Sequence, residues 1–261
     1  MTEFDDSQDL FALDGRTALV TGGTRGIGEA ISLGLAAAGA DVVPVSRTEA
    51  DVETAVESVR ELGASSLVAT LDVTDDDAVQ ATVERIADEL GGVDVLVNNA
   101  GINPPGALGT PGDVDLDAFD NAIDVNLRGA FACTSAASEY LEASEDGVVV
   151  NVASVGGLVG LPRQHPYVAS KHGLVGMTKS MALDWAPEVR VTGLAPGYVA
   201  TDLTAALRDD DNLRQSVLDR TPLERFADPG EIAGPAVFLA SPAASFITGE
   251  VLAADGGWTA Q

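Results

Sequence analysis

Short apolar runs rich in β-branched residues alternate with amphipathic segments along most of this chain, and this alternation restricts its fold more than any other feature. Strand, helix and strand in succession form a right-handed parallel unit, and repeats of that unit build one parallel sheet with helices on both faces. The run from Gly147 to Val152 is typical of a strand that is buried on both faces. The expected strands are 17–20, 41–45, 66–71, 93–97, 147–152, 190–195 and 250–254.

The segments between these runs have the period of α-helices. Ile27, Ile31 and Leu35 recur at intervals of four and form one apolar stripe. Further helices are expected near 52–62, 79–90, 167–185 and 229–239, and Thr74 with Asp77 predicts a capping box before the helix at 79–90. We therefore predict an α/β fold, a single-domain Rossmann-type doubly wound parallel sheet that binds ligands beyond the carboxyl ends of its strands.

The composition contains no break that suggests a second domain. We expect residues 15–261 to form a single dinucleotide-binding and catalytic domain, with an irregular, substrate-covering segment at about 198–224. Residues 1–14 are acidic and lack the basic start and apolar core of a secretory signal, so they predict a flexible N-terminal arm. The one cysteine, Cys133, excludes an internal disulfide and is expected to be a small buried residue.

The charge is strongly negative. The chain has 41 acidic and 14 basic residues, for a formal net charge of −27. A field of that sign repels nucleic acid and anionic membrane surfaces, and no apolar run reaches the ~18 residues of a membrane-spanning helix. The acidic residues are spread through periodic segments, which excludes a disordered acidic tail. The composition resembles the haloarchaeal type and predicts a halophilic, cytoplasmic protein.

A glycine-rich turn joins the first strand to the first helix. Glycines permit positive φ and a close backbone approach, and the helix N-terminus offers free N–H groups to a pyrophosphate. An ordinary tight turn between strand and helix is the alternative, but the position of the turn in the first strand–helix unit favours a cofactor site. The residues expected to bind cofactor here are Thr21, Gly22, Arg25, Gly26, Ile27 and Gly28.

The end of the second strand bears on the choice of cofactor. An NAD-selecting enzyme often has a carboxylate here, whereas this chain has Ser46 and Arg47. Arg47 and Arg25 can form a fork around a 2′-phosphate, so NADP is favoured over NAD. Two solvated surface arginines are the alternative. Asp72, with its neighbour Val73, closes the expected third strand and is predicted to lie beside the adenine.

Tyr167 and Lys171 open a predicted helix four residues apart, which places them on one face. A phenol with a pKa near ~10 exchanges protons poorly at neutral pH, and a neighbouring ammonium lowers that pKa. Ser154 ends the preceding buried strand and can hydrogen-bond a substrate oxygen. A serine nucleophile is disfavoured because the G-x-S-x-G elbow is missing. Two histidines without a ligand cluster disfavour a metal site.

Five motifs occur in a fixed order along the chain: the glycine turn with Thr21, Asn98–Gly101, Ser154, Tyr167 with Lys171, and Pro196–Gly197. In this order and spacing the chain resembles the short-chain dehydrogenase/reductase family of the classical type, over about residues 12–261.

The resemblance implies a role for each matching residue. Tyr167 is the acid/base, Ser154 holds the substrate oxygen, and Lys171 binds the nicotinamide ribose. Asn126 matches an asparagine that holds a water in a proton relay. The resemblance also implies a homotetramer, with the helices of Asn126 and Tyr167 and the last strand at its interfaces. The further cofactor contacts that it implies are Asn99, Ala100, Gly101, Tyr167, Lys171, Pro196, Gly197, Val199 and Thr201.

Two parts of the chain bear on the substrate class. Pro196–Val199 and the end of the chain resemble family members that oxidise sugar acids and polyols, whereas residues 154–171 resemble 3-oxoacyl-thioester reductases equally well. Ser154, Gln164 and Tyr167 are the expected substrate contacts, and an arginine of the covering segment can bind a carboxylate. We favour a sugar acid, a keto-deoxy sugar acid or a polyol. A catalytically silent dinucleotide-binding scaffold is the non-enzyme alternative.

Overall fold

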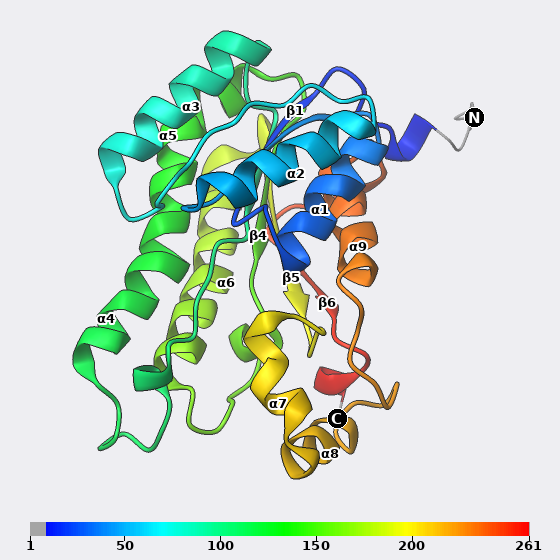
Figure 1. The fold of residues 1–261 in the computed structure, drawn as a ribbon. Helices are drawn as coiled ribbons and strands as arrows, with labels where there is room; N and C mark the ends of the chain where they lie inside the picture. Colours follow the sequence, from blue (N-terminus) through cyan, green and yellow to red (C-terminus); the bar gives the residue numbers. More distant parts are fainter. Residues whose placement is uncertain (1–8, 261) are drawn as a thin grey trace.

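The computed structural model describes residues 9–260, and a parallel sheet runs through the centre of that region (Figure 1). Every pair of neighbouring strands is parallel, in the order β2-β1-β3-β4-β5-β6. The order reverses between β1 and β3, where such sheets bind ligands. The predicted α/β fold is confirmed. The strands are β1 (Thr17–Thr21), β2 (Asp41–Val45), β3 (Val95–Asn98), β4 (Gly147–Val152), β5 (Val189–Pro196) and β6 (Val251–Ala254).

Helices cover both faces of the sheet (Figure 1). Alternate strand residues point to opposite faces, so Val20 packs with α1 and α9 while Leu19 packs with α3 and α5. Burial on both faces explains the continuous apolar runs of the central strands. The helices are α1 (Gly26–Ala37), α2 (Glu49–Glu61), α3 (Asp76–Leu90), α4 (Leu116–Ile123), α5 (Gly129–Ala143), α6 (His165–Trp185), α7 (Ala205–Asp209), α8 (Asp211–Leu218) and α9 (Gly230–Ala240).

The strand predicted at 66–71 is wrong. This segment runs beside β2 but makes only an isolated bridge, between Ser46 and Thr70. The N–H of Asp41 faces β1 and the N–H of Val42 faces this segment, so the period of two directs residue 44 to the segment as well. Residue 44 is Pro44, which has no N–H to donate, and the ladder is interrupted there.

Part of the predicted N-terminal arm packs against the domain. Residues Asp9–Phe11 form a 3₁₀ turn, and the ring of Phe11 lies 6.4 Å from that of Phe238 in α9. Leu13 is fully buried and donates its N–H to the carbonyl of Ala38. The rest of the predicted arm, residues 1–8, lies outside the described residues.

The segment at 198–224 is helical where the sequence predicted irregular structure. A 3₁₀ turn (Asp202–Thr204), α7 and α8 lie beyond the ends of β5 and β6 (Figure 1). Asp210 begins α8 by accepting the N–H groups of Asn212 and Leu213. We call this segment the lid. Its helices are short and largely exposed, so they carry no long apolar stripe for the sequence to display.

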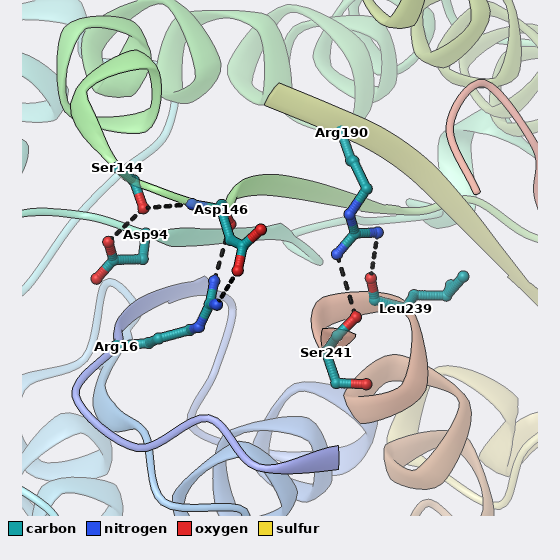
Figure 2. Close-up of polar contacts among 7 residues, drawn as sticks. All are labelled: Arg16, Asp94, Ser144, Asp146, Arg190, Leu239 and Ser241. Carbon is teal, nitrogen blue, oxygen red and sulfur yellow. Dashed lines mark hydrogen bonds and ion pairs between the residues drawn. The ribbon is translucent and has the colours of Figure 1, made fainter. Parts of the chain in front are cut away.

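Charged side chains tie the strands together at the amino edge of the sheet, as Figure 2 shows. Arg16, before β1, binds the carboxylate and the carbonyl of Asp146, before β4. Asp94, before β3, accepts the N–H of Thr17 at 2.8 Å. Arg190 of β5 donates to carbonyl groups at the end of α9 and in the segment that follows it. The acceptors of Arg190 are Leu239 at 2.9 Å, Ser241 at 3.3 Å and Ile247 at 3.5 Å.

We expect Arg190→Met to lower the free energy of unfolding by ~1.5–3 kcal/mol, because it leaves these carbonyl groups without a charged donor. Burial holds the pKa of Arg190 below its usual value, so this cation is already desolvated. Arg128→Met is the control, since Arg128 pairs with Asp76 at the surface, where water screens the ion pair and its contribution to stability is small. Urea unfolding in molar KCl measures both. Equal urea midpoints for the two variants would contradict a stabilising role of the Arg190 hydrogen bonds.

Candidate active site

The glycine turn closes against the end of β3. Gly22 and Gly26 have φ of +61° and +55°, which other residues rarely adopt. A Cβ on residue 28 would overlap the carbonyl oxygen of Gly22 and the side-chain amide of Asn99. The hydroxyl of Thr21 accepts the N–H groups of Asn99 at 3.0 Å and Ala100 at 3.1 Å. These contacts join the carboxyl ends of β1 and β3.

The N-terminus of α1 opens beside this turn. Its first residues receive no side-chain cap, and Arg25, the residue before the helix, is exposed. Ile27 packs against the core and anchors the first turn. Uncapped N–H groups and the positive end of the helix dipole fit an anionic group such as a diphosphate.

Ser46 and Arg47 lie at the end of β2, as predicted. Arg47 is exposed, and its guanidinium lies 3.9 Å from the carboxylate of Asp72. Asp72 accepts the N–H and the hydroxyl of Thr74, and these bonds hold the pKa of Asp72 below its usual range. The predicted capping box at Thr74 is therefore wrong, and Asp75 caps α3 instead. The hydroxyl oxygen of Ser46 is buried and has no hydrogen-bond partner in the described region.

The two asparagines after β3 point in opposite directions. Asn99 donates its side-chain amide to the carbonyls of Thr21 at 3.0 Å and Gly22 at 2.9 Å. Asn98 points into the interior, where its amide donates to Thr134 of α5 and Asn151 of β4. The two side chains diverge because the alternation of a strand places residues 98 and 99 on different faces.

Tyr167 and Lys171 lie one turn apart on α6, with the ammonium of Lys171 5.9 Å from the centre of the Tyr167 ring. Lys171 is buried and donates to the carbonyl of Val152 at 2.8 Å. Ser154 accepts the N–H of Gly156 at 3.0 Å, and its hydroxyl is hydrogen-bonded to the phenol of Tyr167. The sequence placed these three side chains together, and in the structure they form one cluster.

Asn126 reaches the same cluster from a π-helical turn, Asp124–Arg128, between α4 and α5. Its side-chain amide donates to Ile102 at 2.9 Å and to the hydroxyl of Ser170 at 3.1 Å. A Cβ on Gly101 would lie 3.4 Å from the oxygen of Asn126 and 3.5 Å from the nitrogen of Lys171. Asn126 and Lys171 therefore border one space. The wider turn that aims Asn126 inward has no signal in the local sequence.

Burial controls the pKa of both titratable groups in this cluster. Burial raises the pKa of Tyr167, and the hydrogen bond from Ser154 lowers it only in part. Burial also lowers the pKa of Lys171 to about 8. The expectation that the neighbouring ammonium lowers the pKa of Tyr167 below its ordinary value is wrong in direction, because the cost of removing a phenolate from water outweighs the groups around it.

Residues after β5 bring the lid to the glycine turn. Gly197 lies against Asp255, and Val199 forms a bridge to Ala227. The methyl group of Thr201 would lie 3.2 Å from a Cβ on Gly26. The Pro196–Thr201 motif and the glycine turn are therefore adjacent, as the predicted cofactor contacts require.

We call a further group of polar and aromatic side chains the wall; its members come from the segments before α6 and after β5 and from the end of the chain. Gln164, just before α6, accepts the side-chain amide of Asn103 at 2.9 Å. The Tyr198 ring lies 4.8 Å from that of Trp258, and the Arg220 guanidinium lies 4.2 Å from the Trp258 ring. The sequence singled out Gln164 but not Asn103, which carries no motif. Only the fold brings Trp258, from the end of the chain, to Tyr198.

Residues 9–260 contain neither a cluster of metal-ligating side chains nor a membrane-spanning helix. No group of three or more histidine, cysteine or acidic side chains in that range is arranged to hold a metal ion. No helix in the same range is long and apolar enough to cross a membrane. Cys133 is buried in α5, and burial raises the pKa of its thiol to about 12.

Comparison with known proteins identifies the family. A family model described as "Enoyl-(Acyl carrier protein) reductase" matches residues 22–259. The 2-dehydro-3-deoxy-D-gluconate 5-dehydrogenase of Escherichia coli (strain K12) is 38% identical over 254 residues, which are 96% of this chain and 98% of that protein. This chain belongs to the short-chain dehydrogenase/reductase family. The family consists of NAD(P)-dependent oxidoreductases, in agreement with the resemblance inferred from the motifs.

Two further relatives of this short-chain dehydrogenase/reductase differ in substrate. The 3-oxoacyl-[acyl-carrier-protein] reductase of Staphylococcus aureus (strain Mu50) is 38% identical over 244 residues, 93% of this chain and 97% of that protein. The crystal structure of a gluconate 5-dehydrogenase from Burkholderia cenocepacia J2315, in complex with NADP and tartrate, superimposes with a TM-score of 0.93 at 36% identity. The match covers 98% of this chain and all of that one (100%).

The lowered pKa of Lys171 predicts a pH-dependent stability. Below pH ~8 the lysine is protonated in the folded and unfolded chains alike, and the cost of burying the ammonium is fully present. Between pH ~8 and the ordinary value of 10.5 the folded chain has lost a proton that the unfolded chain retains, so stability rises with pH. We expect Lys171→Met to remove this contribution, which has a slope of at most ~1.4 kcal/mol per pH unit.

Lys179→Met is the matched control, because Lys179 is exposed on the same helix and is the other lysine of the chain. Urea unfolding of the three proteins between pH 7.5 and 10 gives the measurement. The free energy of unfolding of the native chain minus that of the Lys171 variant should increase with pH. Parallel curves for the two proteins would contradict the lowered pKa of Lys171.

Proposed function

We propose that this protein transfers a hydride between a nicotinamide cofactor and a secondary alcohol or ketone, with a sugar acid, a keto-deoxy sugar acid or a polyol as its substrate. The observation that carries the proposal is a single cluster of four side chains near the carboxyl end of β1, where the glycine turn begins. The four residues are Asn126, Ser154, Tyr167 and Lys171. A cofactor bound along β1 and β3 has these four side chains at its far end.

Tyr167 is the acid/base of the proposed reaction. Its phenolic oxygen takes the proton from the substrate hydroxyl in oxidation and returns it in reduction. Ser154, hydrogen-bonded to that phenol, binds the substrate oxygen and polarises the carbonyl. The bound nicotinamide supplies the hydride acceptor or donor and, when oxidised, a positive charge. That charge offsets the burial that raises the pKa of Tyr167.

Lys171 and Asn126 assist Tyr167 in the proposed reaction. Lys171 is held by the Val152 carbonyl, which fixes its ammonium for the cofactor ribose and keeps positive charge near the Tyr167 ring. The side chain of Asn126 is held by both backbone groups of Ile102. We propose that Asn126 retains a water that carries the proton on from Lys171.

Two features of the wall favour a hydroxylated acid over an acyl thioester. The paired amides of Asn103 and Gln164 offer hydrogen bonds beside Tyr167 that hydroxyl groups use and an acyl chain does not. The guanidinium of Arg220, held on Trp258, places positive charge near Tyr198 and the substrate. The relatives named for gluconate substrates support the same class.

The relative from Staphylococcus aureus favours a second candidate, a 3-oxoacyl-thioester reductase. A silent dinucleotide-binding scaffold has less support, because all four residues of the catalytic cluster are present and in contact through their shared neighbours.

Hydride transfer in molar KCl, followed by nicotinamide absorbance, tests the substrate class. We expect kcat/KM on a 2-keto-3-deoxy sugar acid or gluconate to exceed that on an acetoacetyl thioester by ~10²-fold or more, because the thioester leaves the amide pair unsatisfied. A preference for the thioester would overturn the substrate assignment in favour of the second candidate.

Tyr167→Phe is the control for the chemistry. It keeps the ring but removes the proton donor, so turnover should fall by ~10²–10⁴-fold with an unchanged Kd for the cofactor. Turnover equal to that of the native chain would exclude Tyr167 as the acid/base.

We also propose that NADP is preferred over NAD. Arg47 is exposed at the end of β2, and its contact with Asp72 is long enough to yield to a 2′-phosphate. The gluconate 5-dehydrogenase crystal structure in complex with NADP supports this choice. We expect Arg47→Ala to weaken NADP binding by ~10–100-fold and NAD binding by less than ~3-fold, because a charged hydrogen bond is lost only with NADP.

Arg85→Ala is the control for Arg47, since Arg85 is an exposed arginine on α3 that pairs with Glu89. Titration of the intrinsic fluorescence with each cofactor gives both Kd values. Equal losses for NADP and NAD in the Arg47 variant would contradict recognition of the 2′-phosphate.

The acidic composition supports the proposal of a halophilic, cytoplasmic protein. The proposed homotetramer is supported by large apolar side chains that this chain leaves exposed to solvent. They include Phe131 on α5, Phe246 beside α9 and Leu252 on β6.

A further inference from the structure

Arg208 in the lid is the arginine whose environment the proposed chemistry does not use. It is half-buried in α7, and one guanidinium nitrogen, Nη2, donates to the carbonyl of Thr201 at 3.1 Å. Its Nε is buried and has no hydrogen-bond partner within residues 9–260. A buried charged donor without an acceptor costs free energy, so this nitrogen fits a site that an anion completes.

Arg208 is connected to the glycine turn through Thr201. The carbonyl that accepts from Arg208 belongs to Thr201, whose methyl group would lie 3.2 Å from a Cβ on Gly26. Thr201 is fixed in turn by reciprocal bonds with Thr204 and by the neighbouring bond from Ala200 to Ala227. One residue therefore separates the arginine from the uncapped N-terminus of α1.

We propose that Arg208 binds an anionic oxygen at the glycine turn, and that this oxygen belongs to the diphosphate of the cofactor. The open N–H groups of α1 bind the diphosphate from one side, and Arg208 binds it from the lid through Nε. A substrate carboxylate has the same chemistry, but the contact of Thr201 with Gly26 favours the diphosphate. The inference rests on the proposed function only in that a dinucleotide binds.

The net charge of the chain gives this arginine a further importance. With a formal charge of −27, the protein repels an anionic dinucleotide at low ionic strength, and carboxylates close to the site still do so in concentrated salt. A cation at the diphosphate offsets this repulsion locally, and the bound diphosphate links α7 to α1. The order of the lid is thereby coupled to cofactor binding before substrate arrives.

Binding measured without turnover tests the assignment. We expect Arg208→Gln to raise the Kd for NADPH and for ADP-ribose by ~10-fold or more, since each carries the diphosphate. The Kd values of Arg208→Lys should lie between those of the native chain and those of the glutamine variant. Adenosine 2′-monophosphate lacks the diphosphate, and its Kd should change by less than ~2-fold. Fluorescence and calorimetric titrations in molar KCl give these values for the full chain.

Arg214→Gln is the matched control, because Arg214 is exposed on α8 of the same lid. Its Kd values should equal those of the native chain. Retained binding of adenosine 2′-monophosphate by the Arg208 variant shows that it is folded.

Three results would overturn the inference. The first is an unchanged Kd for ADP-ribose in the Arg208 variant, and the second is an equal loss of ADP-ribose affinity in the Arg214 variant. The third is an unchanged Kd for the dinucleotide together with a raised KM for the sugar acid, which would assign Arg208 to the substrate carboxylate. A silent substrate panel with the ADP-ribose effect intact would overturn the proposed substrate and leave Arg208 in place. Failure of the native chain to bind any dinucleotide would overturn both the proposed function and the role of Arg208.

Discussion

The contact between the glycine turn and the end of β3 is the constraint on which the rest of the site depends. Asn99 donates to the carbonyls of Thr21 and Gly22, and no side chain fits at residue 28. This packing sets the spacing of β1 and β3 where the strand order reverses. It leaves the N–H groups of α1 open to an anion, and it directs the chain after β3 toward the catalytic cluster.

Desolvation dominates the chemistry of that cluster. Lys171 is buried against a backbone carbonyl, and burial raises the pKa of Tyr167 although an ammonium stands nearby. In the proposed reaction the protonated phenol would donate to a ketone, and its release of a proton in oxidation would depend on positive charge supplied by the cofactor. The free energy spent on burying charge couples acid/base chemistry to cofactor binding.

The lid continues the same electrostatic design. A chain with such an excess of carboxylates retains a few cations where anionic ligands bind, and Arg47, Arg208 and Arg220 lie at successive points of the expected ligand path. Screening lengths shrink to ~3 Å in molar salt, the condition that the proposed halophilic character implies. Only cations held within such a length of the ligand remain effective there, which favours buried or stacked arginines over a diffuse basic surface.

The sequence by itself determined the parallel fold, the glycine turn and the pairing of Tyr167 with Lys171, because each follows from local spacing along the chain. It could not determine the interrupted ladder at Pro44, the inward turn of Asn126 or the pKa of Tyr167. These depend on which segments become neighbours and on how much water they exclude. Arg208 shows the same limit: its spacing carries no motif, and only the fold sets it beside Thr201 and the glycine turn.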